Sequence, residues 1–312
     1  MRSIKDYILL LLKGVAMGGA DVIPGVSGGT IAFITGIYDE LLSSIKSVDL
    51  EALKLLKQFQ IKAFWEHING NFLITLLIGI AISVLSLAKL MSFLLLNHPI
   101  LVWSFFFGLI IISSIIVARD VKERNWKVVI AGIVGIIIAY TISELTPAET
   151  PETWWFIVLS GSLAICAMIL PGISGAFILL ILGKYKFIVT ALNDKDIGII
   201  ALFMTGCLVG ILSFSRLISY LLEHFKSMTI AMLAGFMIGS LNKVWPWKII
   251  DSYRMNSHGE QVPYLDHNVL PNTYLEQTGN DPQLVSALLL ASCGILIVVI
   301  IEKVAARFKV SK

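Results

Sequence analysis

The chain has 312 residues, of which 57% are hydrophobic and 14% charged, and its mean hydropathy is +0.85. These values exclude an ordinary soluble globular protein and indicate a chain embedded in a membrane. The net charge of +3 carries no indication of a nucleic-acid partner, and the three cysteines lie in apolar segments, where we expect free buried thiols and no metal site.

In chain order, the sequence predicts an all-α polytopic membrane protein. A bilayer core of about 30 Å needs roughly 20 apolar residues at 1.5 Å of rise per residue. The first apolar run shows no small-residue cleavage site, so no cleavable signal peptide is expected. The predicted elements are a hairpin at about 7–45, helices at about 72–96 and 99–118, a linking helix at 127–145, a second hairpin at about 153–192, helices at about 197–222 and 227–244, an external loop at 250–282 and a closing helix at 283–306.

Both predicted hairpins contain the same helix-breaking motif. Residues 24–30 read Pro-Gly-Val-Ser-Gly-Gly-Thr, residues 171–177 read Pro-Gly-Ile-Ser-Gly-Ala-Phe, and Gly-x-Tyr follows each copy at the same distance. A helix broken inside hydrocarbon leaves N–H and C=O groups without water, so such breaks are tolerated only when buried in protein or lining a cavity. Two breaks in corresponding positions of two halves are typical of the binding site of a repeat-built transporter.

The two halves also match outside the motif, which favours an internal duplication. Repeat 1 is predicted at 1–120 and repeat 2 at 153–245. Pairs separated by 127 residues include Gly79 with Gly206, Lys89 with Arg216, and Gly108 with Gly235.

The distribution of lysine and arginine predicts the topology. If both motif segments are re-entrant hairpins, fifteen of these residues share one side with both termini and four lie on the other side. If each segment is one full span, the division is twelve to seven. The stronger asymmetry favours hairpins, with both termini cytoplasmic. Three full crossings then separate the motif copies, so the second repeat is expected to be inverted relative to the first, whatever the depth of the hairpins.

Residues 46–66 place apolar side chains among lysines. An amphipathic helix at the cytoplasmic interface and a short soluble helix fit this pattern equally well.

The motif has the chemistry of an anion site. Proline and glycine end the incoming helix, and serine follows at the N-cap of the outgoing helix. Glycines let a ligand approach the unpaired N–H groups of its first turn, where the helix dipole favours phosphate. The alternative is that small residues only allow close packing. The candidate residues are Gly25, Ser27, Gly28, Gly29, Thr30, Gly172, Ser174 and Gly175.

Charged residues within apolar segments are the second indication of a site. Lys89 and Arg216 correspond between the repeats, and inversion would put them at related depths in opposite leaflets. We expect both to contact an anionic head group; snorkelling to the interface is the alternative. Lys13 and Asp21 are candidates for coupling or charge pairing, with a structural ion pair as the alternative.

Both motif copies also fit Gly-x-Ser-Gly, the nucleophile sequence of rhomboid-type intramembrane proteases. A serine nucleophile needs a nearby base, usually histidine, and all five histidines fall in loops or at segment ends. We therefore expect no enzymatic activity, no cofactor and no metal.

The sequence Gly-Gly-Ala-Asp-Val-Ile-Pro-Gly-Val-Ser-Gly-Gly-Thr-Ile-Ala at 18–32, preceded by Lys13-Gly14 and followed by Gly-Ile-Tyr at 36–38, resembles the signature of the PopT polyprenyl-phosphate transporters. The second copy, Ala-Met-Ile-Leu-Pro-Gly-Ile-Ser-Gly at 167–175 with Gly-Lys-Tyr at 183–185, fits the same bacterial membrane family. The resemblance covers nearly the whole chain.

This resemblance implies a flippase in the bacterial cytoplasmic (inner) membrane. Its substrate would be undecaprenyl phosphate, returned from the outer to the cytoplasmic leaflet for reuse in cell-envelope polymers such as peptidoglycan. The expected partners are this lipid and the bilayer, without nucleic acid, and a homo-oligomer is compatible with the sequence. The alternative functions are a secondary transporter or channel for a small soluble anion, and an assembly scaffold.

Overall fold

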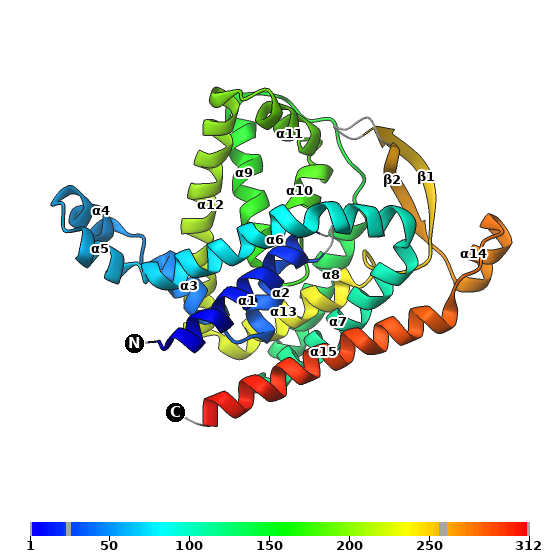
Figure 1. Ribbon diagram of the computed structural model, residues 1–312, viewed down its shortest axis with the longest axis horizontal. Helices are drawn as coiled ribbons and strands as arrows, with labels where there is room; N and C mark the ends of the chain where they lie inside the picture. Colours follow the sequence, from blue (N-terminus) through cyan, green and yellow to red (C-terminus); the bar gives the residue numbers. More distant parts are fainter. Residues whose placement is uncertain (1, 23–25, 256–260, 311–312) are drawn as a thin grey trace.

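The computed structural model describes residues 2–22, 26–255 and 261–310, without the side chains of 88, 89, 92, 254, 255, 261–264 and 304–310. This part of the chain is mostly helical, with one two-stranded sheet (Figure 1). The elements are α1 Ile4–Asp21, α2 Gly28–Ile34, α3 Tyr38–Lys46, α4 Leu50–Lys57, α5 Ile61–His67, α6 Gly70–Asn97, α7 Pro99–Arg119, α8 Trp126–Glu144, α9 Trp154–Ile169, α10 Gly175–Ile181, α11 Tyr185–Asn193, α12 Ile197–His224, α13 Lys226–Ser240, β1 Lys248–Met255, β2 Gln261–Asn268, α14 Pro271–Thr278 and α15 Leu284–Val310.

Among the described residues, five helices are long and apolar enough to cross a membrane: α6, α7, α8, α12 and α15. A sixth span results if α10 and α11, which meet at an angle of 109°, count as one broken segment. The chain is therefore a multi-pass membrane protein. The expected helix over 227–244 is shorter than predicted, because α13 has 15 residues and ends at Ser240. At 1.5 Å per residue this helix covers about 22 Å, less than a bilayer core.

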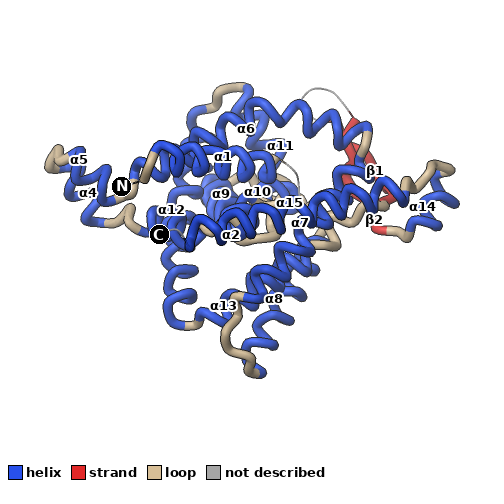
Figure 2. Tube along the Cα trace, turned by 60° about the horizontal axis from the view of Figure 1, so that its bottom comes forward, coloured by secondary structure: helices blue, strands red, loops and turns tan. Residues whose placement is uncertain are grey.

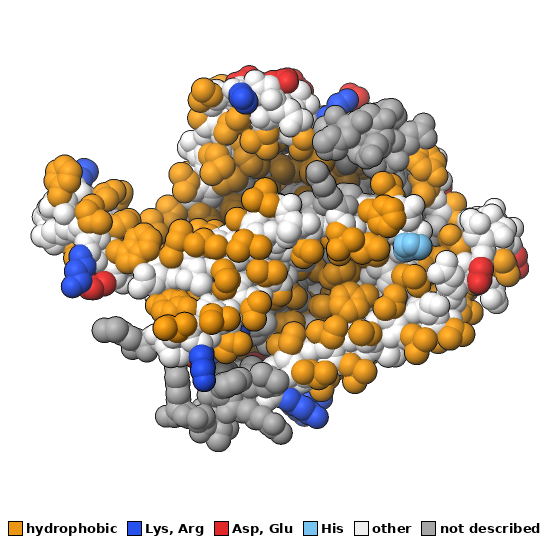
Figure 3. All heavy atoms as spheres, viewed as in Figure 1, with side chains coloured by type: hydrophobic (Ala, Val, Ile, Leu, Met, Phe, Trp, Pro, Cys, Tyr) orange, Lys and Arg blue, Asp and Glu red, His pale blue; other side chains and the backbone are white. Residues whose placement is uncertain are grey.

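The exterior has the composition expected of a surface in contact with lipid. Large apolar side chains cover the face shown in Figure 3, and the charged side chains lie near its edges. Leu85 on α6 is 83% exposed and Val285 on α15 is 73% exposed. In water such a surface would be costly, but in a bilayer the hydrocarbon is its solvent.

Corresponding helices of the two halves make corresponding contacts. Helix α1 packs against α6, as α9 packs against α12. The helix after each half packs on the other half: α8 lies against α13, and α15 lies against α7 (Figure 1). The linking and closing helices therefore tie the two halves together.

Glycines that match between the halves allow the same close approaches. A Cβ atom on Gly79 would lie 2.4 Å from the Leu11 carbonyl oxygen, and one on Gly206 would lie 2.0 Å from that of Val158. The other pair behaves alike, because a Cβ on Gly108 or Gly235 would lie 2.0 or 2.2 Å from a carbonyl oxygen of α15 or α8. These contacts support the predicted duplication, whereas its inverted orientation stays a prediction.

The polar segments lie at opposite ends of the molecule. Figures 1 and 2 place α4 and α5 near the beginning of α1 and the end of α15, with the β-hairpin and α14 at the far end. Residues 46–66, expected to hold one short helix, contain the last residue of α3, all of α4 and most of α5.

The region expected as an external loop, 250–282, is more ordered than predicted. Strand β1 pairs with β2 in antiparallel register, with Lys248 opposite Asn268. Tryptophans before the hairpin anchor it: the Trp245 indole donates to the Val269 carbonyl over 2.8 Å, and that of Trp247 to the Pro282 carbonyl over 2.9 Å. The Trp247 side chain also packs with Ile100 at the beginning of α7 and with Ala287 near the beginning of α15.

Candidate functional site

The two copies of the motif meet in the interior. Ser27 is the N-cap residue of α2, and its Oγ accepts a hydrogen bond from the Gly29 amide over 3.0 Å. The same hydroxyl donates to the Met168 carbonyl, near the end of α9, over 3.0 Å. In return, the Gly172 amide of the second copy donates to Thr30 Oγ1 over 3.1 Å. Residues about 140 positions apart in the sequence therefore form one polar contact.

This contact is closely packed and buried. Ser27 and Thr30 are fully buried, and a Cβ atom on Gly29 would lie 2.5 Å from the Ile169 carbonyl oxygen. Gly172 has φ +90°, a backbone conformation that favours glycine, and lies against Ser240 at the end of α13. The small residues therefore serve the packing of the two motifs directly.

The first turn of α2 already has protein acceptors for its N–H groups. The Gly28 amide donates to Asp21 Oδ1 over 2.7 Å, and the Gly29 amide donates to the Ser27 hydroxyl. The Thr30 amide donates to the Ser27 carbonyl over 3.0 Å. As expected, these N–H groups have no acceptor within α2, but Asp21 and Ser27 supply acceptors from outside it in the first copy. A carboxylate from the end of α1 occupies the position that an anion prefers at a helix N-terminus.

The second copy differs at the equivalent position. Met168 stands 147 residues after Asp21, so α9 brings no carboxylate to the beginning of α10. Ser174, the N-cap residue of α10, makes no side-chain capping hydrogen bond. A Cβ atom on Gly175 would lie 2.6 Å from the Ala164 carbonyl oxygen, so this glycine serves the close packing of α10 on α9. The two copies share a backbone plan but not the same polar groups.

Lys13 and Asp21 act at opposite ends of α2. The Lys13 ammonium donates to the carbonyl of Thr35, the C-cap residue of α2, over 2.8 Å. A cation at the C-terminus and a carboxylate at the N-terminus both complement the helix dipole. These charges therefore stabilise a short, mostly buried helix.

The other predicted site residues either lie away from the contact between the motifs or are not among the described residues and side chains. The Arg216 guanidinium is exposed and donates to the carbonyls of Leu212 and Val48, each over 3.1 Å. Its described contacts thus join α12 to the segment after α3 and do not reach either motif. Lys89 lies on α6 with its side chain outside the described part, and Gly25 lies outside the described residues.

One buried cation was not among the predicted site residues. Lys184 is 2% exposed, and its ammonium donates to the Thr150 carbonyl over 2.7 Å. The rings of Phe156 and Phe187 lie 5.7 and 5.6 Å from the nitrogen. Its place directly after Gly183 in the Gly-x-Tyr sequence was the available signal.

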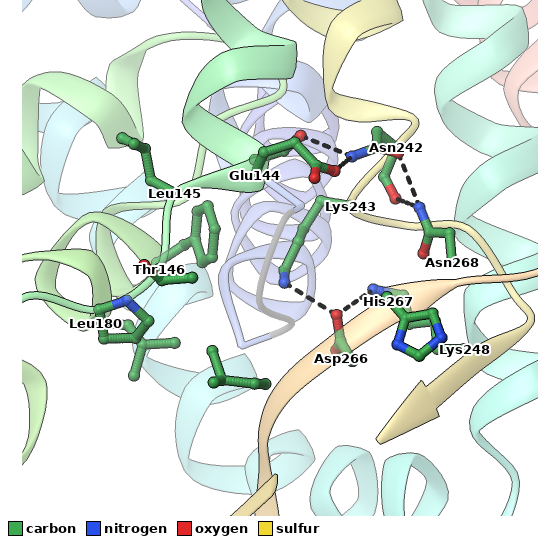
Figure 4. A pocket seen from close by; sticks show the side chains of 14 residues that line it. Glu144, Leu145, Thr146, Leu180, Asn242, Lys243, Lys248, Asp266, His267 and Asn268 are labelled. Carbon is green, nitrogen blue, oxygen red and sulfur yellow. Dashed lines mark hydrogen bonds and ion pairs between the residues drawn. The ribbon is translucent and has the colours of Figure 1, made fainter. Parts of the chain in front are cut away.

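Two cavities lie near the ends of α2 and α10. The larger, about 590 Å³, lies among the ends of α2, α3, α7, α12 and α13. The smaller, about 110 Å³, lies among α8, α10, the end of α13 and the β-hairpin (Figure 4). Phe33 lines the first and Leu180 lines the second, and these residues are 147 positions apart. Each repeat therefore contributes an equivalent helix to one cavity.

Duplicated broken helices that meet inside a bundle of apolar spans define a multi-pass membrane protein with an interior polar site. The chain belongs to the VCA0040-like family, described as undecaprenyl phosphate translocase-like, whose model matches residues 17–262.

Named relatives cover most of the chain. A polyprenyl-phosphate transporter of Vibrio cholerae is 46% identical over 302 residues, covering 97% of this chain and 98% of the relative. A polyprenyl-phosphate transporter of Staphylococcus aureus is 36% identical over 255 residues, covering 76% of this chain and 85% of the relative. No solved structure matches significantly.

Proposed function

We propose that this protein is an undecaprenyl phosphate flippase of the bacterial cytoplasmic membrane. It would return the lipid carrier from the outer to the cytoplasmic leaflet for reuse in cell-envelope polymer synthesis. Family membership and the printed names of the two relatives support a polyprenyl phosphate as the substrate. The charge distribution supports cytoplasmic termini.

The observation that carries the proposal is the buried polar contact between the motifs. Moving a phosphate through hydrocarbon is costly unless polar groups replace its water, whereas a prenyl tail can stay in lipid. The hydroxyls of Ser27 and Thr30 and the Gly172 amide supply such groups in the interior. The proposed phosphate path therefore passes this contact, with Ser174, Gly175, Gly28 and Gly29 along it.

Asp21 has a specific role in this proposal. Its carboxylate holds the Gly28 amide in the structure, so a phosphate that reached α2 would compete with it. Two anions at one helix end repel each other, and release or protonation of Asp21 would relieve the repulsion. We assign Asp21 as the candidate coupling residue on this ground.

Alternating access between inverted repeats would expose the site to each leaflet in turn. The interrupted pairs α1–α2 and α9–α10 serve as the two arms of this movement, as re-entrant hairpins. The two cavities at the ends of α2 and α10 would be the mouths of the path. Lys89 and Arg216 would attract the head group at related depths of the two leaflets.

A reconstituted flipping assay tests this function. The full chain is placed in liposomes with a fluorescent undecaprenyl phosphate, and the label accessible outside is followed with time. We expect movement with the wild type and slower movement with Ser27→Ala and with the Lys89→Ala, Arg216→Ala double variant. Ser86→Ala is the matched control, because its hydroxyl bonds only within α6.

The outcomes separate the candidate functions. No movement of the lipid by the wild type would refute the flippase. Uptake of soluble phosphate without lipid movement would support the small-anion transporter. Wild-type rates in the Ser27 variant and the double variant would refute the assigned site.

A further inference from the structure

The smaller cavity holds two lysines that share one carboxylate oxygen. Lys243 follows the end of α13 and Lys248 begins β1, and Figure 4 shows both directed at Asp266 of β2. Their ammonium groups lie 3.5 and 3.3 Å from Asp266 Oδ1. These are long contacts for charge-assisted hydrogen bonds, which are usually about 2.7–2.9 Å.

Among the described residues, each of the two ammonium groups has one hydrogen-bond acceptor and keeps further N–H donors without one. Each ammonium has three N–H donors, and Asp266 is the one hydrogen-bond acceptor described for each. Each ammonium group also lies over an aromatic ring. The centre of the Phe177 ring is 4.9 Å from the Lys243 nitrogen, and that of the Trp103 ring is 5.5 Å from the Lys248 nitrogen. The Lys248 side chain is only 10% exposed. A buried ammonium with unused donors calls for an acceptor-rich ligand.

Burial also lowers the pKa of Lys248 to about 8, although Asp266 opposes this effect. Lys248 therefore gains a favourable interaction from any anion that enters the cavity. A phosphate monoester, with three acceptor oxygens and up to two negative charges, supplies what one carboxylate oxygen does not.

We propose that this cavity binds a phosphate monoester between Lys243 and Lys248, and that the phosphate takes over both ammonium groups from Asp266. The phosphate is that of the transported lipid or a free phosphate ion. For the lipid, the inference rests on the proposed function and makes the cavity a capture site on the side predicted to be external. Phe177 and Leu180 of α10, which follows the second motif, form part of its wall.

The remaining charges around the cavity belong to Glu144 and His267, and Glu144 attracts the Lys248 ammonium more weakly than Asp266 does. The Glu144 carboxylate accepts a hydrogen bond from the Asn242 amide. The His267 ring contacts Asp251 over 2.9 Å. Asp266 is therefore the direct competitor of a bound anion. Removing its charge should strengthen binding of the anion. If the cluster only fastened the hairpin to α13, the same change would weaken the fold and improve nothing.

The test is equilibrium binding to the full chain in nanodiscs of zwitterionic lipid at pH 7. The probes are radiolabelled inorganic phosphate, a short-chain prenyl phosphate and the corresponding prenyl alcohol. We expect Lys243→Gln with Lys248→Gln to weaken binding of a phosphate-bearing probe at least tenfold without changing binding of the alcohol. We expect Asp266→Asn to strengthen that binding severalfold. Lys195→Gln, an exposed lysine on the same predicted side, is the control.

Each outcome decides one point. If only the prenyl phosphate shows lysine-dependent binding, the ligand is the lipid head group. If inorganic phosphate also shows it, the ligand is the free ion. Unchanged binding in the double lysine variant, or weaker binding in Asp266→Asn with an unchanged unfolding temperature, overturns the inference. If Asp266→Asn unfolds, the double lysine variant decides alone: a tenfold loss of phosphate binding supports the site, and unchanged binding refutes it. Lysine-dependent binding without lipid flipping would refute the proposed function alone.

Discussion

The Gly172 amide of the second motif donates a hydrogen bond to the Thr30 hydroxyl of the first motif over 3.1 Å. Both groups are buried, and the residues lie 142 positions apart. This bond ties the beginning of α2 to the break before α10. A movement that separated the motifs would have to break it or exchange it for a bond to substrate.

Thr30→Val is expected to destabilise the protein, because it removes the acceptor and leaves the Gly172 amide buried without a partner. An unsatisfied buried donor costs about 1–3 kcal/mol. The unfolding temperature in detergent measures the effect. Thr75→Val is the control, because the Thr75 hydroxyl donates to the Asn71 carbonyl within α6, in an exposed hydrogen bond. Equal effects of the two variants would contradict the assigned role of Thr30.

Gly235→Ala and Gly132→Ala are expected to have different effects on stability, although both glycines lie in the contact of α13 with α8. A Cβ on Gly235 would lie 2.2 Å from the Gly132 carbonyl oxygen, and the cost of such overpacking is about 1–3 kcal/mol. A Cβ on Gly132 would lie 3.5 Å from its nearest neighbour, so alanine there fits and improves helix propensity by up to about 1 kcal/mol. Thermal unfolding compares the variants, and similar losses in both would refute this packing.

Asp21→Asn is expected to keep the fold and to strengthen binding of a phosphate head group at the motifs. The amide oxygen of asparagine can still accept the hydrogen bond from the Gly28 amide. The negative charge of the Asp21 carboxylate, which would repel phosphate, is removed. Binding of a prenyl phosphate to the nanodisc-embedded chain measures the change, in a background with Lys243→Gln and Lys248→Gln to silence the second cavity. Asp194→Asn is the control, because this carboxylate is exposed at the end of α11 and lines neither cavity. An effect of equal size there would remove the argument for Asp21.

The sequence predicted the apolar spans and the duplication because both depend on local composition and on residue spacing. The break at the motif followed from proline and glycine, and Ser27 is an N-cap residue as expected. The place of Asp21 depended on the angle between α1 and α2, which no local pattern specifies. The same applies to Arg216, whose partner Val48 is remote in the sequence.

The misjudged elements were those decided by tertiary contacts. Helix α13 ends at Ser240, where Asn242 turns to bond with Ser143 and Glu144 of α8. The β-hairpin had a detectable signal, because two stretches with isoleucine, valine and tyrosine flank the turn-forming sequence Asn-Ser-His-Gly-Glu at 256–260. The polar character of the whole region outweighed it.

Anion binding in the smaller cavity is expected to weaken as the pH rises through about 8. Burial lowers the pKa of Lys248 to that value, so its ammonium is charged below pH 8 and neutral above it, whereas a phosphate monoester stays a dianion across this range. The other charged or titratable groups around the cavity are Lys243, Asp266, Glu144 and His267. Because a bound anion favours the charged amine, the midpoint should move upward when ligand is present.

Affinity for the phosphate probe, measured from pH 6.5 to 10, tests this expectation. The wild type should lose affinity above about pH 8, the value to which burial lowers the pKa of Lys248. Lys248→Arg should flatten the curve above pH 8, since a guanidinium stays charged throughout this range. A profile that is flat in the wild type, or equally steep in Lys248→Arg, would show that Lys248 does not hold the anion. Lys195→Gln should reproduce the wild-type curve, because this lysine lies in the turn before α12 and outside the cavity.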